Sequence, residues 1–247
     1  MNVPNQPSEI RRNRRPARWT GRLGGLGGMA RGVLALLCAA PFLAGCARLT
    51  QRMAIIGPSY QPGNVYLGGE KLPRSLKRVA VLPVTARGAD PELGGSRTTL
   101  EQALQTELGK RARFEVVPVT PDALRQWTGR SQWVTTDRFP TNFFDRLRDG
   151  TGCDAVLFAQ VTDFRAYPPL AVGWRLQLLD CDGLQVWWAV DEHFDASEPA
   201  VANAARRFHL EHAGKPAELT DTGEVLYSPR RFGSYAANAI VATCPGQ

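Results

Sequence analysis

The chain has 247 residues, of which 43% are hydrophobic and 21% are charged, and its formal net charge is +7. Residues 1–45 hold seven arginines and one acidic residue, for a net charge of +6, so the remaining 23 basic and 22 acidic side chains sum to +1. The excess of basic residues therefore lies in the leader. The net charge of the rest of the chain gives no reason to expect nucleic-acid binding. No zinc-finger spacing, glycine-rich phosphate loop or basic-aromatic stripe points that way either.

The basic leader is followed by an apolar run and then by a cysteine. The apolar run, residues 32–44, is 13 residues long, whereas a membrane-spanning helix needs about 20. It has the length of a signal-peptide apolar region. The next segment, Leu43-Ala44-Gly45-Cys46, resembles the lipobox of bacterial lipoproteins. The resemblance implies that residues 1–45 are a signal peptide and that Cys46 is the acylated first residue of the mature protein.

Two features bear on how this leader is used. Met29 begins a shorter segment that would be a complete signal by itself. Either translation starts at Met29, or residues 1–28 are an unusual basic extension of the signal. The paired arginines also suggest a twin-arginine signal, although Asn13 and Pro16 follow them instead of apolar residues. Two or three acyl chains on Cys46 would hold the protein on a membrane, since one chain alone binds only marginally. Ala47, in place of the aspartate that retains lipoproteins at the inner membrane, favours the outer membrane, facing the periplasm.

Residues 46–75 are rich in Gly, Pro, Ser and Arg and lack periodicity, so we predict a flexible tether there. Residues 76–247 are predicted to form a single domain. Its first half alternates strands and helices. The predicted elements are a strand at 79–84, a loop at 87–96, a helix at 98–111, a strand at 114–119, a helix starting at Thr120-Pro121, a helix at 142–148 ended by Gly150, and a strand at 155–164.

The second half changes to alternating strands. Residues 172–180 and 184–194 alternate apolar and polar side chains, and Asp182-Gly183 between them predicts a tight hairpin. Helices are predicted at 198–212 and from Ser228-Pro229 onward. The order predicts an α/β (α+β) fold: a mixed sheet with two N-terminal β/α units, an antiparallel meander and C-terminal helices packed on it.

Several of these segments together resemble a broad group of bacterial envelope lipoproteins. They are residues 78–84, 114–117, 152–158 and the hairpin at 178–188. The group includes the curli secretion-channel lipoprotein and the lipoprotein activators of penicillin-binding proteins. The resemblance covers residues 77–195 and implies a periplasmic domain that assembles or regulates envelope components without catalysis. The channel members carry additional long strand pairs, and here only the 172–194 hairpin approaches the 9–11 residues that a barrel strand needs.

Three cysteines besides Cys46 remain in the mature chain, and an oxidising periplasm would permit pairing. If the strands at 155–164 and 172–181 form an antiparallel pair, Cys153 lies opposite residue 183, two positions from Cys181. A Cys153–Cys181 disulfide is the favoured pairing. Cys244 could replace either partner, and all three could be free core thiols.

Other chemistry-bearing residues have simpler interpretations. His209 and His212 are one helical turn apart, but a zinc site needs further ligands, so we interpret them as part of a solvated helix face. The acidic residues at 180–195 lie at a turn and a strand end, where carboxylates usually accept backbone hydrogen bonds. No hydrolase motif is present, so we predict no catalytic residue, no metal and no cofactor.

Trp187 and Trp188 are adjacent on a predicted strand, where neighbouring side chains point to opposite faces. One belongs in the core, and the other is covered by a helix or forms a partner surface, for which Trp187 is the candidate. We therefore expect a lipid-anchored, non-catalytic binding or assembly factor whose partners are the membrane and an envelope protein or a second copy. A homo-oligomeric secretion-channel subunit and a periplasmic hydrolase are the alternatives.

Overall fold

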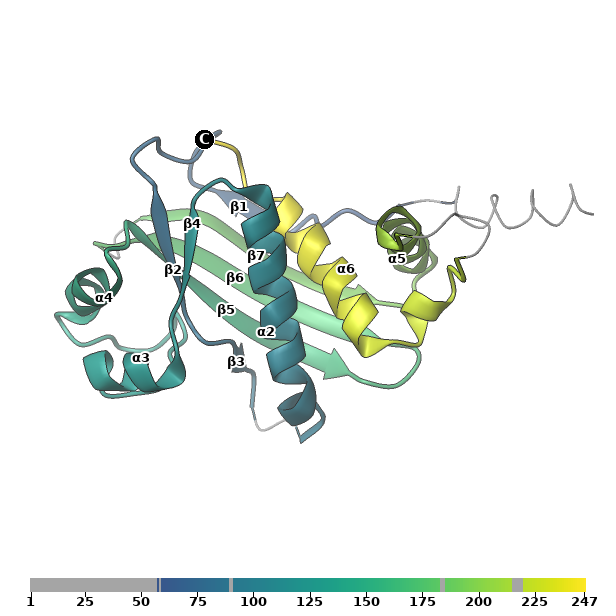
Figure 1. The fold of residues 1–247 in the computed structure, drawn as a ribbon, viewed down its shortest axis with the longest axis horizontal. Coiled ribbons are helices and arrows are strands. Elements are labelled where there is room, and N and C mark those ends of the chain that lie inside the picture. Colours follow the sequence, from purple (N-terminus) through teal and green to yellow (C-terminus); the bar gives the residue numbers. More distant parts are fainter. Residues whose placement is uncertain (1–56, 58, 89–90, 183–184, 215–219) are drawn as a thin grey trace, which may run out of the picture. The chain divides into compact units, whose positions relative to one another are not determined.

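The computed structural model describes residues 57, 59–88, 91–182, 185–214 and 220–247, which form a sheet with helices on both faces (Figure 1). The strands are β1 Val65–Leu67, β2 Arg78–Val81, β3 Thr85–Ala86, β4 Glu115–Pro118, β5 Ala155–Arg165, β6 Ala171–Asp180 and β7 Val186–Asp195. The helices are α2 Pro91–Arg111, α3 Pro121–Thr128, α4 Phe143–Thr151, α5 Pro199–His212, the 3-10 turn η2 Glu224–Leu226 and α6 Pro229–Ala242.

The sheet is mixed and confirms the predicted fold class. Its seven strands have the order β1-β7-β6-β5-β2-β4, with β3 pairing β5 beside this path. β2 is parallel to both β4 and β5, which makes two β/α units, whereas β5, β6 and β7 form the predicted antiparallel meander. The parallel pairs need helical crossovers, and α2, α3 and α4 supply them.

Alternation along the strands divides the interior into two clusters on opposite faces of the sheet. In β2, Val79 and Val81 enter the first cluster, and Ala80 enters the second. The first cluster is covered by α2, α5 and α6, which contribute Leu104, Ala205 and other apolar side chains. The second cluster is covered by α3 and α4. Figure 1 shows α2 and α6 crossing one face of β5, β6 and β7.

Two predicted helix starts are confirmed by their caps. The hydroxyl of Thr120 accepts a hydrogen bond from the N–H of Ala123 at 3.2 Å, and that of Ser228 accepts one from Arg231 at 3.4 Å. The predicted end of α4 at Gly150 is wrong. The helix continues to Gly152, which has the left-handed φ of 65°. Glycines in that conformation end helices without strain.

Gly150 has a packing role instead. A Cβ at this position would lie 2.7 Å from the ring of Trp127, so the absence of a side chain lets α4 approach α3.

The first helix of the domain is longer than predicted. We expected a loop at 87–96 because Gly94 and Gly95 disfavour helix, yet α2 begins at Pro91. Leu93 is 2% exposed and lies seven residues before the buried Leu100, on the same helix face. Burial of this side chain outweighs the low helix propensity of the two exposed glycines.

The domain also begins earlier than predicted, inside the expected tether of residues 46–75. β1 pairs with β7, with Val65 opposite Val190. The ring of Tyr60 packs against Phe194 at 5.4 Å between centroids, and Leu72 is buried in the first cluster. A three-residue strand between glycines and prolines is too short to show an alternation of apolar and polar residues, so it could not be predicted from the sequence pattern.

Candidate functional site

A groove lies over α6, between α2 and α5, and we call it the α6 groove. It encloses about 400 Å³, a volume within the range of small-ligand and peptide-side-chain sites. Its lining comes from these three helices and the residue after α5: Thr99, Gln102, Ala103, Thr106, Glu107, Lys110, Phe208, His209, His212, Ala213, Arg230, Arg231 and Ser234.

The floor of the groove is set by the close packing of α6 against α2. A Cβ on Gly233 would lie 2.6 Å from Cδ2 of Leu100, so a larger residue there would force this methyl group to move. Phe232 and Tyr235 face the core, which leaves Arg230, Arg231 and Ser234 toward the groove. The side chains that α6 presents to the groove are therefore polar, and α2 and α5 form the walls on either side.

The wall formed by α2 contains a buried carboxylate. Glu107 is 3% exposed. Its Oε1 accepts from Nζ of Lys110 at 2.5 Å, and its Oε2 accepts from Nδ2 of Asn238 in α6 at 2.8 Å. Both carboxylate oxygens thus have partners, which offsets the cost of burying the charge.

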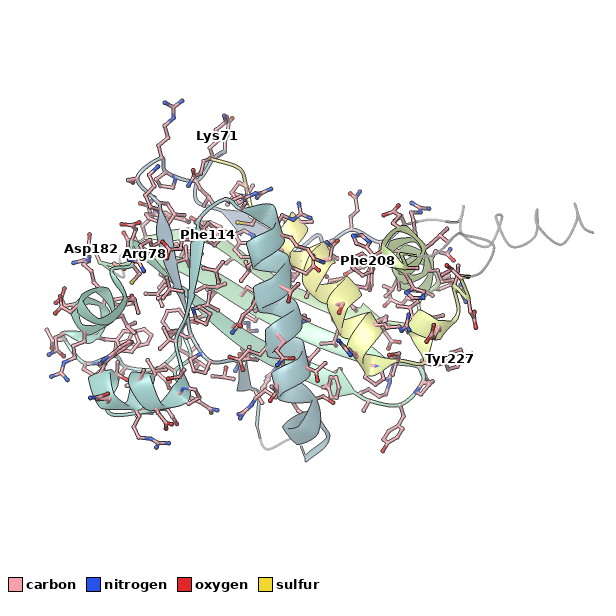
Figure 2. All side chains as sticks on the ribbon, viewed as in Figure 1. Lys71, Arg78, Phe114, Asp182, Phe208 and Tyr227 are labelled. Carbon is pink, nitrogen blue, oxygen red and sulfur yellow. The ribbon has the colours of Figure 1, made fainter. Side chains whose placement is uncertain are left out.

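The wall formed by α5 is aromatic. The rings of Phe208 and His212 are stacked with centroids 4.2 Å apart, one helical turn from each other. Phe208 also packs against Tyr235 of α6 at 6.0 Å, and Figure 2 shows it between α5 and α6. Nδ1 of His212 lies 2.9 Å from the carbonyl oxygen of Phe208, which fixes the ring against the helix.

His209 is buried rather than part of a solvated helix face, which corrects the sequence interpretation. It is 7% exposed, and its Nε2 lies 3.2 Å from Nη1 of Arg231 and 3.8 Å from the carboxylate of Glu224. Burial, followed by the charge of Arg231, lowers the pKa of His209, while Glu224 and Asp221 oppose the shift. A neutral Nε2 can accept the hydrogen bond that the guanidinium donates.

His209 and His212 do not converge on a common point. His209 faces Arg231, whereas His212 stacks on Phe208. Nowhere in the described part of the chain do three or more His, Cys, Asp or Glu side chains gather as a group of metal ligands.

Cys46 lies outside the described residues, but Cys153 and Cys181 are brought together as the sequence predicted. Their Sγ atoms are 3.1 Å apart, and both are free thiols in the second core cluster. Cys244 is buried in the first cluster, on the opposite face of the sheet. The sheet therefore separates Cys244 from the other two, and the disulfide remains a prediction.

Trp188 is fully buried, and its Nε1 donates to Oγ1 of Thr243 at 3.1 Å. Trp187 does not face away from it as strand alternation predicts. The β6–β7 register shifts here, with Leu178 opposite Trp188 and Leu179 opposite Val186, so Trp187 is an extra, bulged residue. It is half-buried, packs against the same core cluster and does not line the α6 groove.

The acidic residues of the meander are spread over several local roles. Both oxygens of Glu192 accept hydrogen bonds from the segment before β1, including one from the hydroxyl of Tyr60 at 2.5 Å. Asp191 pairs with Arg175, and Asp182 with Arg148 at 2.7 Å. None of these carboxylates lines the α6 groove.

The α6 groove was not predicted from the sequence. Its α2 residues follow helical spacing, but so do the polar side chains on any solvent-facing helix. The one local signal was the apolar face of α6. It predicted which side of α6 is buried, but not that α2 and α5 form walls along the other side.

No protein-family model matches the sequence, and no curated protein sequence matches it either. Several solved structures share a distant likeness. The PelC dodecamer from Paraburkholderia phytofirmans is 13% identical, with 76% of this chain and 96% of that chain covered and a TM-score of 0.37. Lipoprotein GNA1162 from Neisseria meningitidis is 17% identical, with 48% and 79% covered and a TM-score of 0.33.

The LpoB C-terminal domain from Salmonella enterica is 16% identical, with 47% of this chain and 81% of that chain covered and a TM-score of 0.31. The likeness to these three structures is distant, and scores at this level carry no argument about a shared role. Among the helices that the structure describes, none is both long and apolar enough to span a membrane.

Proposed function

We propose that this chain is a lipoprotein anchored through Cys46 to the periplasmic side of the outer membrane, and that its domain binds an acidic segment of another envelope protein in the α6 groove without catalysis. The observation that carries the binding role is the excess of positive charge in that groove. Its lining has three cationic side chains, Lys110, Arg230 and Arg231, and one acidic side chain, Glu107.

The charges inside the groove indicate which group is available to a partner. Lys110 is paired with Glu107 at 2.5 Å, and Arg231 with Glu224 at 2.8 Å. Arg230 is exposed, and its guanidinium has no partner among the described residues. A carboxylate on the partner would complete this site, and the Phe208 ring offers an apolar surface next to it. Charge complementarity of this kind contributes mainly specificity and association rate.

The titratable side chains of the groove support binding rather than catalysis. A general base needs an accessible atom within hydrogen-bond reach of its substrate. Nε2 of His209 instead faces the Arg231 guanidinium, and both oxygens of Glu107 are engaged by Lys110 and Asn238. The two buried titratable side chains of the groove, His209 and Glu107, are thus already engaged by neighbours within the fold.

The anchor sets how far the start of the domain can lie from the bilayer. The segment from Cys46 to Gly57 contains 12 residues, and an extended chain spans about 3.3–3.6 Å per residue, or at most about 40 Å. The domain begins at Tyr60 rather than at residue 76 because the chain there already packs on β7. A tether of this length keeps the start of the domain within about 40 Å of the membrane surface.

Site-specific photocrosslinking in cells tests the binding role. A photoreactive amino acid replaces Gln102, an exposed residue of the groove wall, or Gln126, an exposed glutamine of α3 on the other face. We expect one envelope protein to be captured from position 102 and not from position 126. Arg230→Glu should abolish the adduct, whereas Arg125→Glu in α3 should leave it intact.

Three results would count against this function. They are no adduct at position 102, equal capture from both positions, or an adduct that survives Arg230→Glu. An adduct to a second copy of the chain would favour the homo-oligomeric alternative instead.

The anchor has a separate test. Incorporation of labelled palmitate should be lost in Cys46→Ser and kept in Cys38→Ser, which changes the other cysteine of the N-terminal segment. Label retained in Cys46→Ser would overturn the lipoprotein assignment without affecting the groove.

A further inference from the structure

Cys153 and Cys181 lie at the open end of the β5–β6 hairpin. Cys153 precedes β5 by two residues, and Cys181 directly follows β6. The ladder continues to them, because Ala155 is opposite Asp180 and the N–H of Cys181 donates to the carbonyl of Asp154 at 3.0 Å. The two Sγ atoms are 3.1 Å apart, and a sulfur–sulfur bond of about 2.05 Å requires an approach of only about 1 Å.

We infer that Cys153 and Cys181 are a disulfide site that closes by thiol–disulfide exchange. The register of the hairpin, rather than a flexible loop, sets this pairing. Cys244 is excluded as a partner because it lies on the other face of the sheet. The inference does not depend on the α6 groove.

The two thiols are chemically unequal. The hydrogen bond from the Cys181 thiol, together with those from Thr151 and from backbone N–H groups of Cys153 and Ala80, lowers the pKa of Cys153 to about 7, against the opposing effect of burial. The same contact with Cys153, together with burial, raises the pKa of Cys181. These shifts belong to the packed pair, whose Sγ atoms are 3.1 Å apart. The thiolate, which is the nucleophilic form, can arise on either cysteine once the cluster is open.

The oxidant is a disulfide, either of a small thiol or of a protein oxidoreductase. The thiolate of one cysteine attacks one of its sulfurs, the sulfur–sulfur bond of the oxidant breaks, and one thiolate departs. The other cysteine then loses its proton to that thiolate and attacks the protein sulfur of the mixed disulfide, which releases the second thiolate. Two protein thiols are thereby oxidised by two electrons, and the oxidant is reduced to two thiols.

The packing around the pair determines when this exchange can occur. Cys153 is 2% and Cys181 3% exposed, within a cluster that includes Phe143 and Leu147 of α4. A disulfide reagent cannot reach either sulfur while α4 covers them. The bond should therefore form while the second core cluster is open, during folding or when α4 detaches.

Refolding in a glutathione redox buffer tests the bond. The reduced full-length chain is diluted from urea into oxidised and reduced glutathione, and a second sample of native reduced protein receives the same buffer. Tryptic peptides 149–165 and 176–206 should be recovered as one linked species, with the Cys244 peptide 232–247 unlinked. Linking should be much faster in the refolding sample than in the native one. Both cysteines free after refolding, or a bond to Cys244, would overturn the proposal.

Discussion

Asn238 in α6 donates a hydrogen bond from Nδ2 to Oε2 of Glu107 in α2 over 2.8 Å. The other carboxylate oxygen accepts from Lys110, one turn further along α2. Because Glu107 is almost fully buried, this carboxylate joins the wall of the α6 groove to the helix that forms its floor. The groove is thus held by a charged contact inside the packed layer, not by surface ion pairs.

Removing this carboxylate should destabilise the domain. Glu107→Ala leaves the half-buried amide of Asn238 without its acceptor, and we expect a loss of about 1–3 kcal/mol in the free energy of unfolding. Glu107→Gln keeps an acceptor and should lose less. Urea unfolding measures both. Glu211→Ala, an exposed position in α5, is the control and should change stability little. Equal effects of Glu107→Ala and Glu211→Ala would contradict this role.

Two adjacent glycines should respond differently to alanine. A Cβ on Gly68 would lie 2.4 Å from the carbonyl oxygen of Val186, a backbone atom that cannot turn aside, whereas the nearest atom to one on Gly69 is 3.6 Å away. Gly68→Ala should therefore detach β1 from β7 and cost about 1–3 kcal/mol. Hydrogen exchange should accelerate in that variant alone at the N–H of residue 68, which donates to Trp187, and at that of Asp191, which donates to Asn64. Unchanged protection there would show that the β7 bulge can adjust.

The meander and the helix caps could be predicted because their signals are local. The alternation of 172–180 sets which side chains of β6 enter the core, and a Thr-Pro or Ser-Pro pair carries its own capping hydrogen bond. The Cys153–Cys181 contact could also be predicted, because antiparallel pairing of two neighbouring strands allows few registers. These features depend on residues that are close in the sequence or joined by one short turn.

Other features depend on contacts between distant segments, so no local pattern contains them. β1 is specified by the edge of β7, and the start of α2 by the burial of Leu93. The bulge at Trp187 breaks the alternation from which we predicted that Trp187 and Trp188 face opposite sides of the sheet. The α6 groove depends on the close packing of α6 against α2 at Gly233. A glycine in a helical sequence does not by itself indicate such a contact.

His209 should make stability depend on pH. Its pKa is lowered in the folded state, where it faces Arg231, Glu224 and Asp221. Below the ordinary value of about 6.5, the unfolded chain binds a proton that the folded chain does not, so the free energy of unfolding falls as the pH drops. His209→Gln should flatten this slope between pH 5 and 7.

The neighbouring His212→Gln serves as the matched control and should keep the slope. The pKa of Asp195 is also lowered, mainly by hydrogen bonds from Ser197 and Arg165 that outweigh its burial. An aspartate with an ordinary pKa near 4 contributes its slope at more acidic pH, outside this window. A slope that persists in His209→Gln would assign the pH dependence to other groups.

Reduction should destabilise the oxidised protein by an amount set by the length of chain that the bond closes. Cys153 and Cys181 are 28 residues apart, and loop-closure entropy for such a loop gives about 3.6 kcal/mol. Urea unfolding of the oxidised chain with and without a phosphine reductant measures the difference. Cys244→Ser should show the same shift, because its thiol lies across the sheet, whereas Cys153→Ser with Cys181→Ser should show none. A shift that disappears in Cys244→Ser, or persists in the double variant, would mean that a different pair of sulfurs closes the loop.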